Sequence, residues 1–305
     1  MPFFASGMKT VGAFIEQAKQ ELQHLYDESE LQHVVFLMLE EVLGFSRTDL
    51  QLRSREELDE KSIERLDDFV RQLKAGRPLQ YVLGYAWFSG MKFIVNENVL
   101  IPRPETEELV EWILSPVTEL TTTNLILDIG AGSGCIAISI KKALPAAAVH
   151  AIDISEAALL VAKQNAETNA AVVNFFKGDI LSTDFQNTVE EKFDVIVSNP
   201  PYVRKSEMNS MASQVKDHEP HTALFVEDED PLIFYSAIAD FAKTHLKEGG
   251  QLFFEINATL GTEVRNLLLK KGFLNVELKK DISGSDRMVR AFAALNPHPD
   301  SYRDN

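Results

Sequence analysis

The sequence predicts an α/β protein in which a small N-terminal helical bundle and a β-hairpin linker precede a seven-stranded, mostly parallel sheet. Apolar residues recur at helical spacing over the first seventy-odd residues, and short β-branched runs then alternate with helical patterns. Such alternation is typical of parallel strands joined by helices. The expected boundaries are 1–78 for the helical domain, 79–103 for the linker, 104–296 for the sheet domain and 297–305 for a polar tail.

Length and composition restrict the class of protein. The 305 residues are 45% hydrophobic, which suits one large folded domain and a smaller one. The net charge of −16 disfavours attraction of the whole molecule to nucleic-acid phosphates or anionic bilayers. Cys135 is the single cysteine, and the chain has neither a signal-peptide pattern nor a membrane-spanning run. We therefore expect a cytoplasmic monomer with no metal, no disulfide, and no direct contact with nucleic acid or membrane.

Two apolar stripes mark helices in the N-terminal part, each followed by a glycine suited to a helix C-terminus, Gly44 and Gly76. The members of the first stripe are Leu31, Val34, Val35, Met38 and Val42, and those of the second are Ile63, Leu66, Phe69, Val70 and Leu73. Each helix buries one face, so the pattern predicts a small bundle. No cluster of chemical groups stands out, and recognition of a partner macromolecule is the expected role.

The linker contains aromatic and β-branched residues punctuated by glycines over 79–95, which predicts a β-hairpin. Arg103 follows, between two prolines that restrict its backbone. Two interpretations remain open for this arginine. Its charge is held in one place for function, or it forms an ordinary ion pair with Glu105 or Glu107.

A strand over 125–129, a glycine loop and a helical segment from Cys135 form a unit suited to a nucleotide-derived cofactor, because glycines let a ligand approach the backbone closely. The glycines are spaced G-x-G-x-G after an acidic residue, unlike a dinucleotide fingerprint, and no phosphate-binding lysine follows. This spacing favours S-adenosylmethionine. Cys135 should pack as a small hydrophobe rather than act as a catalytic thiol. The candidate loop residues are Gly130, Ala131, Gly132, Ser133 and Gly134.

Acidic residues end the next two predicted strands. Asp153 follows an apolar run, and a carboxylate there can accept hydrogen bonds from both ribose hydroxyls. Asp179 follows the third strand, where it can accept the adenine amino group while Ile180 covers the ring. Core packing is the alternative interpretation for Ile180.

The stretch from Asp194 to Tyr202 contains the residues that we expect to bind the group that is methylated. Its apolar run predicts a buried strand that the two prolines end at Asn199. The Asn199 side-chain oxygen and the Pro200 carbonyl can accept both hydrogens of a planar amino group, and Tyr202 can stack on it. A sulfonium methyl is already electrophilic, so the site needs alignment rather than a general base. A proline turn that merely ends a strand would not explain Asn199 and Tyr202 beside a methyl-donor loop.

Asn-Pro-Pro-Tyr at 199–202, the Asp-Ile-Gly-Ala-Gly-Ser-Gly loop at 128–134 and the segment 77–110 together resemble the HemK/PrmC family. These bacterial enzymes methylate the glutamine of peptide chain release factors. The motif at 199–202 is shared with adenine-N6 methyltransferases, whereas Arg-Pro-Leu-Gln-Tyr and Ile-Pro-Arg-Pro-Glu-Thr-Glu are far more specific.

The resemblance implies a Rossmann-like, class I S-adenosylmethionine-dependent fold and methyl transfer to the amide nitrogen (N5) of the Gly-Gly-Gln glutamine. It assigns the glycine loop, Asp153 and Asn199 to the cofactor. It assigns Asn199, Pro200, Pro201 and Tyr202 to the substrate glutamine. The helical domain would help to recognise the release factor.

The segment that begins at Glu219 also resembles the family, which has a Glu-Pro-x-x-Ala-Leu stretch near its active site. Glu219 and Arg103 are therefore further candidates for substrate binding. The chain departs from the family over 225–232, where a glycine-rich turn is usual. A helix stop at 247–250 and three further strands, at 251–256, 273–278 and 288–293, complete the expected sheet, with a hairpin loop over 281–287.

Three alternative functions remain. The chain could methylate a ribosomal-protein glutamine or the N6 nitrogen of adenine in nucleic acid, or it could be a catalytically silent module that binds S-adenosylmethionine. The acidic charge and the lack of a base-recognition segment disfavour adenine as a substrate.

Overall fold

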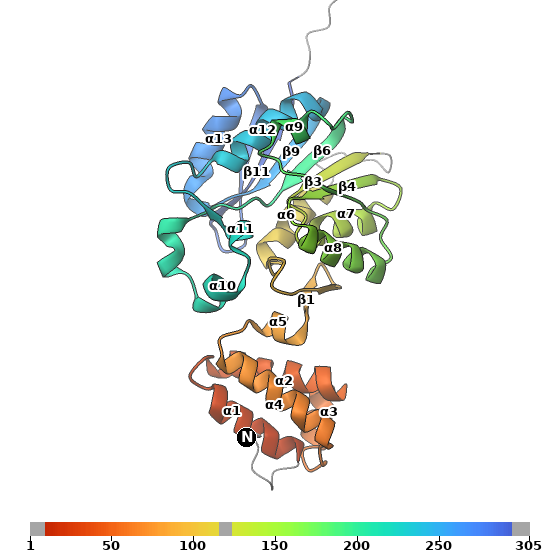
Figure 1. Cartoon of the computed structure of the whole chain (residues 1–305), viewed down its shortest axis with the longest axis vertical. Coiled ribbons are helices and arrows are strands. Elements are labelled where there is room, and N and C mark those ends of the chain that lie inside the picture. The colour runs from red at the N-terminus through yellow and green to blue at the C-terminus, as the bar shows by residue number, and fades with distance from the viewer. Residues whose placement is uncertain (1–9, 116–123, 295–305) are drawn as a thin grey trace, which may run out of the picture. The chain divides into compact units, whose positions relative to one another are not determined.

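The computed structural model describes residues 10–115 and 124–294, so the expected polar tail over 297–305 lies outside the described residues. The chain divides into two compact units (Figure 1). The first runs to Tyr85 and includes Ala212–His218, and the second holds Ala86–Met211 and the chain from Glu219 onward. No helix in the described ranges is long and apolar enough to cross a membrane.

The first unit is helical. The predicted stripes lie in α2 and α4, where leucine, valine, phenylalanine and methionine side chains form one buried cluster. Gly44 ends α2 with a φ of +69°, the left-handed conformation that a glycine accepts without strain. The helices are α1 (Val11–Leu22), α2 (Glu28–Leu43), α3 (Arg47–Leu52), α4 (Glu60–Lys74), α5 (Leu79–Leu83) and α10 (Ser213–His218).

The expected hairpin linker begins later than predicted. Residues Leu79–Leu83 form the short helix α5, which follows Pro78 and ends at Gly84. Proline suits a helix N-terminus because it has no N–H to leave unpaired, and burial of Tyr81 and Val82 favours the helical turn over a strand. The two-stranded hairpin that follows consists of β1 (Tyr85–Phe88) and β2 (Met91–Ile94).

The second unit contains the seven-stranded sheet in the order β10-β11-β9-β6-β3-β4-β5. The strands from β9 to β5 pair in parallel, whereas β11 is antiparallel to both of its neighbours. The mostly parallel, seven-stranded prediction is confirmed. The strands are β3 (Leu125–Ile129), β4 (Ala148–Asp153), β5 (Asn174–Lys177), β6 (Phe193–Ser198), β9 (Leu246–Glu255), β10 (Leu274–Lys280) and β11 (Asp286–Phe292).

One strand begins earlier than expected. Residues 247–250 were expected as a helix stop, but β9 already starts at Leu246. Its pairing with β6 jumps from Leu246 to Gln251, so the extra residues form an irregularity within the strand. The expected loop between the last two strands is present between Lys280 and Asp286.

Helices cover both faces of the sheet (Figure 1). One buried cluster joins α6, α7 and α8 to the sheet, and a second joins α12 and α13 to the opposite face. Cys135 lies in the first cluster, so it packs as the predicted small hydrophobe. The helices are α6 (Pro104–Leu114), α7 (Cys135–Ala143), α8 (Glu156–Thr168), α9 (Thr183–Gln186), α11 (His221–Leu224), α12 (Ile233–His245) and α13 (Gly261–Lys270).

The Asn165 side chain on α8 forms hydrogen bonds with the hairpin strand β2 and with the loop that follows β3. Its side-chain oxygen accepts the Ile94 N–H at 2.6 Å, and its Nδ2 donates to the carbonyls of Ile94 and Ser133 at 3.0 and 2.9 Å. The Asn165 side chain is fully buried. One amide therefore satisfies three backbone groups that would otherwise be unpaired.

A buried carboxylate joins β3 to α7. Asp128 accepts the Ala137 N–H at 3.2 Å through Oδ2, while its Oδ1 is buried with no hydrogen-bond partner in the described structure. Burial raises the pKa of Asp128 to about 7, although the bond from Ala137 acts in the opposite direction. This carboxyl group therefore titrates near neutral pH.

We predict that Asn165→Leu lowers the free energy of unfolding of the second unit by about 2–4 kcal/mol, because it leaves buried backbone groups unpaired. Both tryptophans, Trp87 and Trp112, belong to this unit, so urea unfolding followed by tryptophan fluorescence reports on it. The control is Asn169→Leu, which removes the more exposed bond from Asn169 to the Lys92 carbonyl. Equal losses for the two variants would contradict the special role of Asn165.

We also predict that Asp128 makes stability depend on pH. Between about pH 4 and 7 the folded protein keeps a proton on Asp128 that the unfolded chain has released, so rising pH favours unfolding. From pH 5 to pH 7 the wild type should lose about 2 kcal/mol relative to Asp128→Asn. The measurement is urea unfolding at a series of pH values, and parallel curves for the two proteins would refute the assignment.

Candidate active site

The register of the parallel strands brings the predicted site residues to one edge of the sheet. Ile129 pairs with Ile152 on one side and with Ser198 on the other. Ser198 in turn pairs with Phe254 of β9. The residues that follow, Gly130, Asp153, Asn199 and Glu255, therefore lie in neighbouring positions at the carboxyl ends of four strands. Open α/β sheets bind ligands at this edge.

The glycine loop is tied to the strand beside it. The N–H groups of Gly130 and Ala131 both donate to the Ile152 carbonyl at 2.9 Å. The Gly132 N–H donates to Asp153 Oδ2 at 2.8 Å. Gly132 has a φ of +53°, and a Cβ there would meet nothing within 4 Å, so this part of the loop faces open space. A ligand can therefore reach the backbone at this point.

The far end of the loop is tightly packed. Ser133 is buried, and its carbonyl accepts the bond from Asn165. Gly134 has a φ of +81°, and a Cβ there would lie 3.0 Å from Ile138 Cδ1 and 3.2 Å from Ala162 Cβ. A side chain at Gly134 would therefore separate α7 from α8. The backbone of the loop is therefore accessible at Gly132 and tightly packed at Gly134.

Two carboxylates flank the loop. Asp153 accepts backbone N–H groups from Gly132 and Ser155, each at 2.8 Å, and burial raises its pKa while these bonds lower it. Asp128 retains one buried oxygen without a partner in the described structure. Carboxylate oxygens with spare acceptor capacity suit a ligand that carries hydroxyl and ammonium donors. S-adenosylmethionine has a ribose and an amino-acid ammonium group, so the residues present fit it.

Asp179 and Ile180 follow β5. Asp179 is half-buried, and its Oδ1 accepts the Leu181 N–H at 2.8 Å. Ile180 is buried in the cluster that packs against α12. Core packing accounts for this side chain in the ligand-free protein, while Asp179 remains a candidate acceptor for the adenine amino group.

The Asn199 side chain is held from the first turn of α6. Its Nδ2 donates to Thr106 Oγ1 at 3.2 Å. The preceding Ser198 is buried, and its hydroxyl donates to the Ile129 carbonyl at 2.6 Å, which fixes the strand end. No described residue donates a hydrogen bond to Asn199 Oδ1 or to the Pro200 carbonyl. Both predicted acceptors therefore keep their hydrogen-bonding capacity within the described structure.

Tyr202 is held by β9 and the segment after it. Its hydroxyl donates to Glu255 Oε1 at 3.1 Å, and its carbonyl accepts Asn257 Nδ2 at 3.2 Å. Burial raises the pKa of Tyr202 well above its usual value, with the Glu255 charge acting in the same direction. The phenol therefore remains protonated. Pro200 is buried and Pro201 half-buried between these anchors.

Arg103 has a partner that the sequence did not indicate. Its guanidinium Nη2 lies 2.5 Å from Oε1 of the buried Glu219, whose Oε2 accepts the Ile101 N–H at 3.2 Å. Of the two interpretations left open for Arg103, the ion pair with Glu105 or Glu107 is not the one the structure has, and Glu107 instead accepts the Ser89 N–H at 2.9 Å. Extended backbone at Arg103 directs the side chain toward a residue that is distant in sequence. Two substrate candidates, Arg103 and Glu219, thus form one ion pair.

The loop that departs from the family pattern is ordered against the motif segment. Strand β8 (Phe225–Val226) pairs in parallel with β7 (Val203–Arg204), directly after Tyr202. Asp228 accepts the Ser206 hydroxyl at 2.5 Å, and Glu227 forms an ion pair with Lys205. Acidic residues thus replace a glycine-rich turn and bind the segment that follows the motif.

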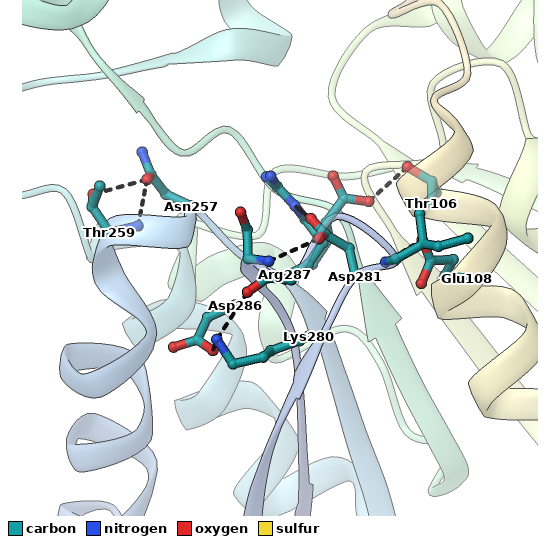
Figure 2. A network of polar contacts seen from close by, with 12 residues as sticks. Thr106, Glu108, Asn257, Thr259, Lys280, Asp281, Asp286 and Arg287 are labelled. Atoms are coloured by element: carbon teal, nitrogen blue, oxygen red, sulfur yellow. Dashed lines mark hydrogen bonds and ion pairs between the residues drawn. The ribbon is translucent and has the colours of Figure 1, made fainter.

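Three polar residues of this site were not singled out by the sequence interpretation, namely Thr106, Glu255 and Asn257. Figure 2 shows Thr106 and Asn257 in one polar network with Asp281 and Arg287. Glu255 had a detectable signal, because it ends an apolar strand at the same edge as Asn199. Thr106 lies within the Ile-Pro-Arg-Pro-Glu-Thr-Glu motif but looks like an ordinary residue of a first helical turn.

The groups at this edge are amides, hydroxyls and carboxylates. Within residues 10–115 and 124–294, no three His, Cys, Asp or Glu side chains gather closely enough to hold a metal ion. Burial raises the pKa of the nearby Cys135 to about 12, so its thiol stays protonated.

Family models match both units of the chain. The model described as the PrmC N-terminal domain matches residues 13–84, and the methyltransferase small domain matches residues 109–218. Among solved structures, a methyltransferase from Pyrococcus furiosus is similar with a TM-score of 0.50 and 21% identity, over 68% of this chain and 91% of that one. That likeness concerns the fold.

Curated relatives cover nearly the whole chain. The release factor glutamine methyltransferase of Flavobacterium psychrophilum is 48% identical over 90% of this chain and 96% of its own length. The protein of the same name from Bacteroides thetaiotaomicron is 42% identical over 93% of this chain and 99% of its own. Together with the glycine loop, the Asn-Pro-Pro-Tyr motif and the helical unit, these matches establish that the chain belongs to the HemK/PrmC family of release factor glutamine methyltransferases.

Proposed function

We propose that the protein transfers a methyl group from S-adenosylmethionine to the side-chain amide nitrogen, N5, of the Gly-Gly-Gln glutamine in peptide chain release factors. The observation that carries this proposal is the hydrogen bond that orients the Asn199 side-chain amide. Its Nδ2 is bound to Thr106, which leaves Oδ1 as an acceptor beside the Pro200 carbonyl. Close relatives with this name over almost their full length support the choice of substrate.

The chemistry follows from these two acceptors. An amide nitrogen is a poor nucleophile because its lone pair is delocalised into the carbonyl. Asn199 Oδ1 and the Pro200 carbonyl accept its two hydrogens, hold the nitrogen in place and stabilise the positive charge that develops on it. Tyr202 packs on the planar group, and Pro201 keeps the turn rigid. The nitrogen would form a bond to the methyl carbon as the bond between that carbon and the sulfonium sulfur breaks. The methylated nitrogen then carries a positive charge and loses one proton to water, so no strong base is required.

The cofactor is assigned to the same carboxyl edge of the sheet, at the strands that end in the glycine loop and in Asp153. S-adenosylmethionine supplies an electrophilic methyl group when bound. The glycine loop from Gly130 to Gly134 would provide backbone access, Asp153 would accept the ribose hydroxyls, and Asp179 would accept the adenine amino group beside Ile180. The spare Oδ1 of Asp128 suits the ammonium group. Asn199 is assigned to both ligands, so it would link cofactor and substrate.

Substrate recognition extends beyond the glutamine. The Arg103–Glu219 ion pair holds the segment before α6 against the segment before α11, and we assign it to the walls that receive the substrate loop. The helical unit is assigned to recognition of the release factor. We expect the protein to act as a monomer in the cytoplasm, on a protein rather than on nucleic acid or a membrane.

The alternative functions can be distinguished by the substrate that is methylated. Methyl transfer from labelled S-adenosylmethionine should be compared for a release factor, ribosomal proteins and DNA or RNA that contains adenine. We expect label on the Gly-Gly-Gln glutamine, located by mass spectrometry. Label on adenine or only on a ribosomal protein would refute the proposed substrate, and absence of label on every substrate would favour a silent cofactor-binding module.

We predict that Asn199→Ala lowers kcat for release-factor methylation at least about 100-fold, because it removes an acceptor that acts in the transition state. The dissociation constant for the cofactor should change by less than about tenfold, since the glycine loop and Asp153 remain. Asn187→Ala, an exposed asparagine at the end of α9, is the matched control. Unchanged kcat in Asn199→Ala would remove this residue from the mechanism.

A further inference from the structure

A chain of hydrogen bonds connects Asn199 to a buried carboxylate through three elements of the sheet unit. Asn199 Nδ2 donates to Thr106 Oγ1 at 3.2 Å, and the Thr106 hydroxyl donates to Glu255 Oε2 at 2.6 Å. Thr106 is 3% exposed and Glu255 is 1% exposed. The chain therefore runs from the motif, through the first turn of α6, to the end of β9, shielded from water beyond Asn199.

The direction of these bonds is set by chemistry. An ionised carboxylate can only accept hydrogen bonds, and a threonine hydroxyl has a single hydrogen to donate. Thr106 gives that hydrogen to Glu255, so toward Asn199 it can only accept. The Asn199 amide must then turn its NH₂ group to Thr106, which leaves Oδ1 on the other side. A carboxylate buried two bonds away thus selects one of the two orientations of the amide.

Three groups act against the rise in the pKa of Glu255 that burial causes. Burial raises the pKa of Glu255, whereas the hydrogen bonds from Thr106 and Tyr202 and the charge of Arg287 lower it. Arg287 is itself held by Asp281, with its Nε 3.1 Å from Asp281 Oδ2 (Figure 2). Two hydroxyl donors and a neighbouring cation compensate in part for the loss of solvation by water.

We propose that Glu255 and Thr106 are positioning residues that fix the orientation of the Asn199 amide so that its oxygen faces the substrate nitrogen. The inference rests on the proposed function and extends it. A glutamine amide offers two N–H donors, so a flipped Asn199 would present its own NH₂ to another NH₂. That arrangement loses a hydrogen bond and places two positive dipole ends in contact.

The kinetic test compares Thr106→Val with Thr106→Ser. Valine keeps the shape of threonine and removes the hydroxyl, so kcat for methylation of the release factor should fall about 10- to 100-fold. The dissociation constant for the cofactor should stay within about threefold, because the hydrogen bonds of the Thr106 side chain go to Glu255 and Asn199 rather than to the glycine loop. Serine keeps the hydroxyl and should retain kcat within about threefold. Thr244→Val, at the end of α12, removes a hydroxyl bonded to a helix carbonyl and serves as the matched control.

A second measurement does not depend on activity. With selective ¹⁵N labelling of asparagine, the Asn199 side-chain NH₂ signal is assigned by its absence from Asn199→Ala. One of its hydrogens should exchange slowly with solvent in the wild type and in Thr106→Ser, and rapidly in Thr106→Val. Wild-type protein alone thus tests the bond if the valine variant does not fold.

The outcomes separate the two proposals. A wild type with a protected Asn199 amide that does not methylate release factors would refute the proposed function and leave the bond to Thr106 intact. Rapid exchange in the wild type, wild-type kcat in Thr106→Val, or an equal loss of kcat in Thr106→Ser and Thr106→Val would overturn the positioning role.

Discussion

The buried Glu255 carboxylate, which accepts hydrogen bonds from Thr106 and Tyr202, is the interaction on which the arrangement of the site depends. Desolvation of this charge is costly, and the two hydroxyls and the Arg287 cation offset that cost. Since these groups come from α6, the motif segment and the start of β11, the carboxylate joins parts of the chain that are distant in sequence. Both ends of the motif are linked to this carboxylate, Tyr202 directly and Asn199 through Thr106.

The parallel sheet makes this convergence possible. Strand register places Gly130, Asp153, Asn199 and Glu255 at neighbouring strand ends, so the glycine loop and the Asn-Pro-Pro-Tyr motif meet without any long loop reaching across. Two features hold the end of the glycine loop that leads into α7. Gly134 packs tightly against α7 and α8, and the Asn165 side chain donates a hydrogen bond to the Ser133 carbonyl. Preorganisation of this kind suits a reaction in which alignment, rather than acid–base chemistry, limits the rate.

The sequence predicted those structural features that are determined by residues close together in the chain. The strand before Asn199, the glycine loop and the stripes of α2 and α4 follow from periodicity and from the backbone restrictions of proline and glycine. The partner of Arg103 could not be predicted, because Glu219 lies more than a hundred residues away and neighbouring acids offered plausible alternatives. The role of Thr106 was hidden for the same reason, since its bond to Glu255 exists only after β9 lies beside β6. Helix α5 replaced part of the expected hairpin because burial of Tyr81 and Val82 outweighed β propensity.

Neutron diffraction from a crystal with the demethylated cofactor product and a Gly-Gly-Gln peptide would test the central claim most directly, because it locates the hydrogens. The account predicts deuterium on Asn199 Nδ2 pointing to Thr106 Oγ1, deuterium on Thr106 pointing to Glu255, and Asn199 Oδ1 accepting from the glutamine amide. An Asn199 amide whose oxygen faces Thr106, with its NH₂ toward the peptide, would contradict it.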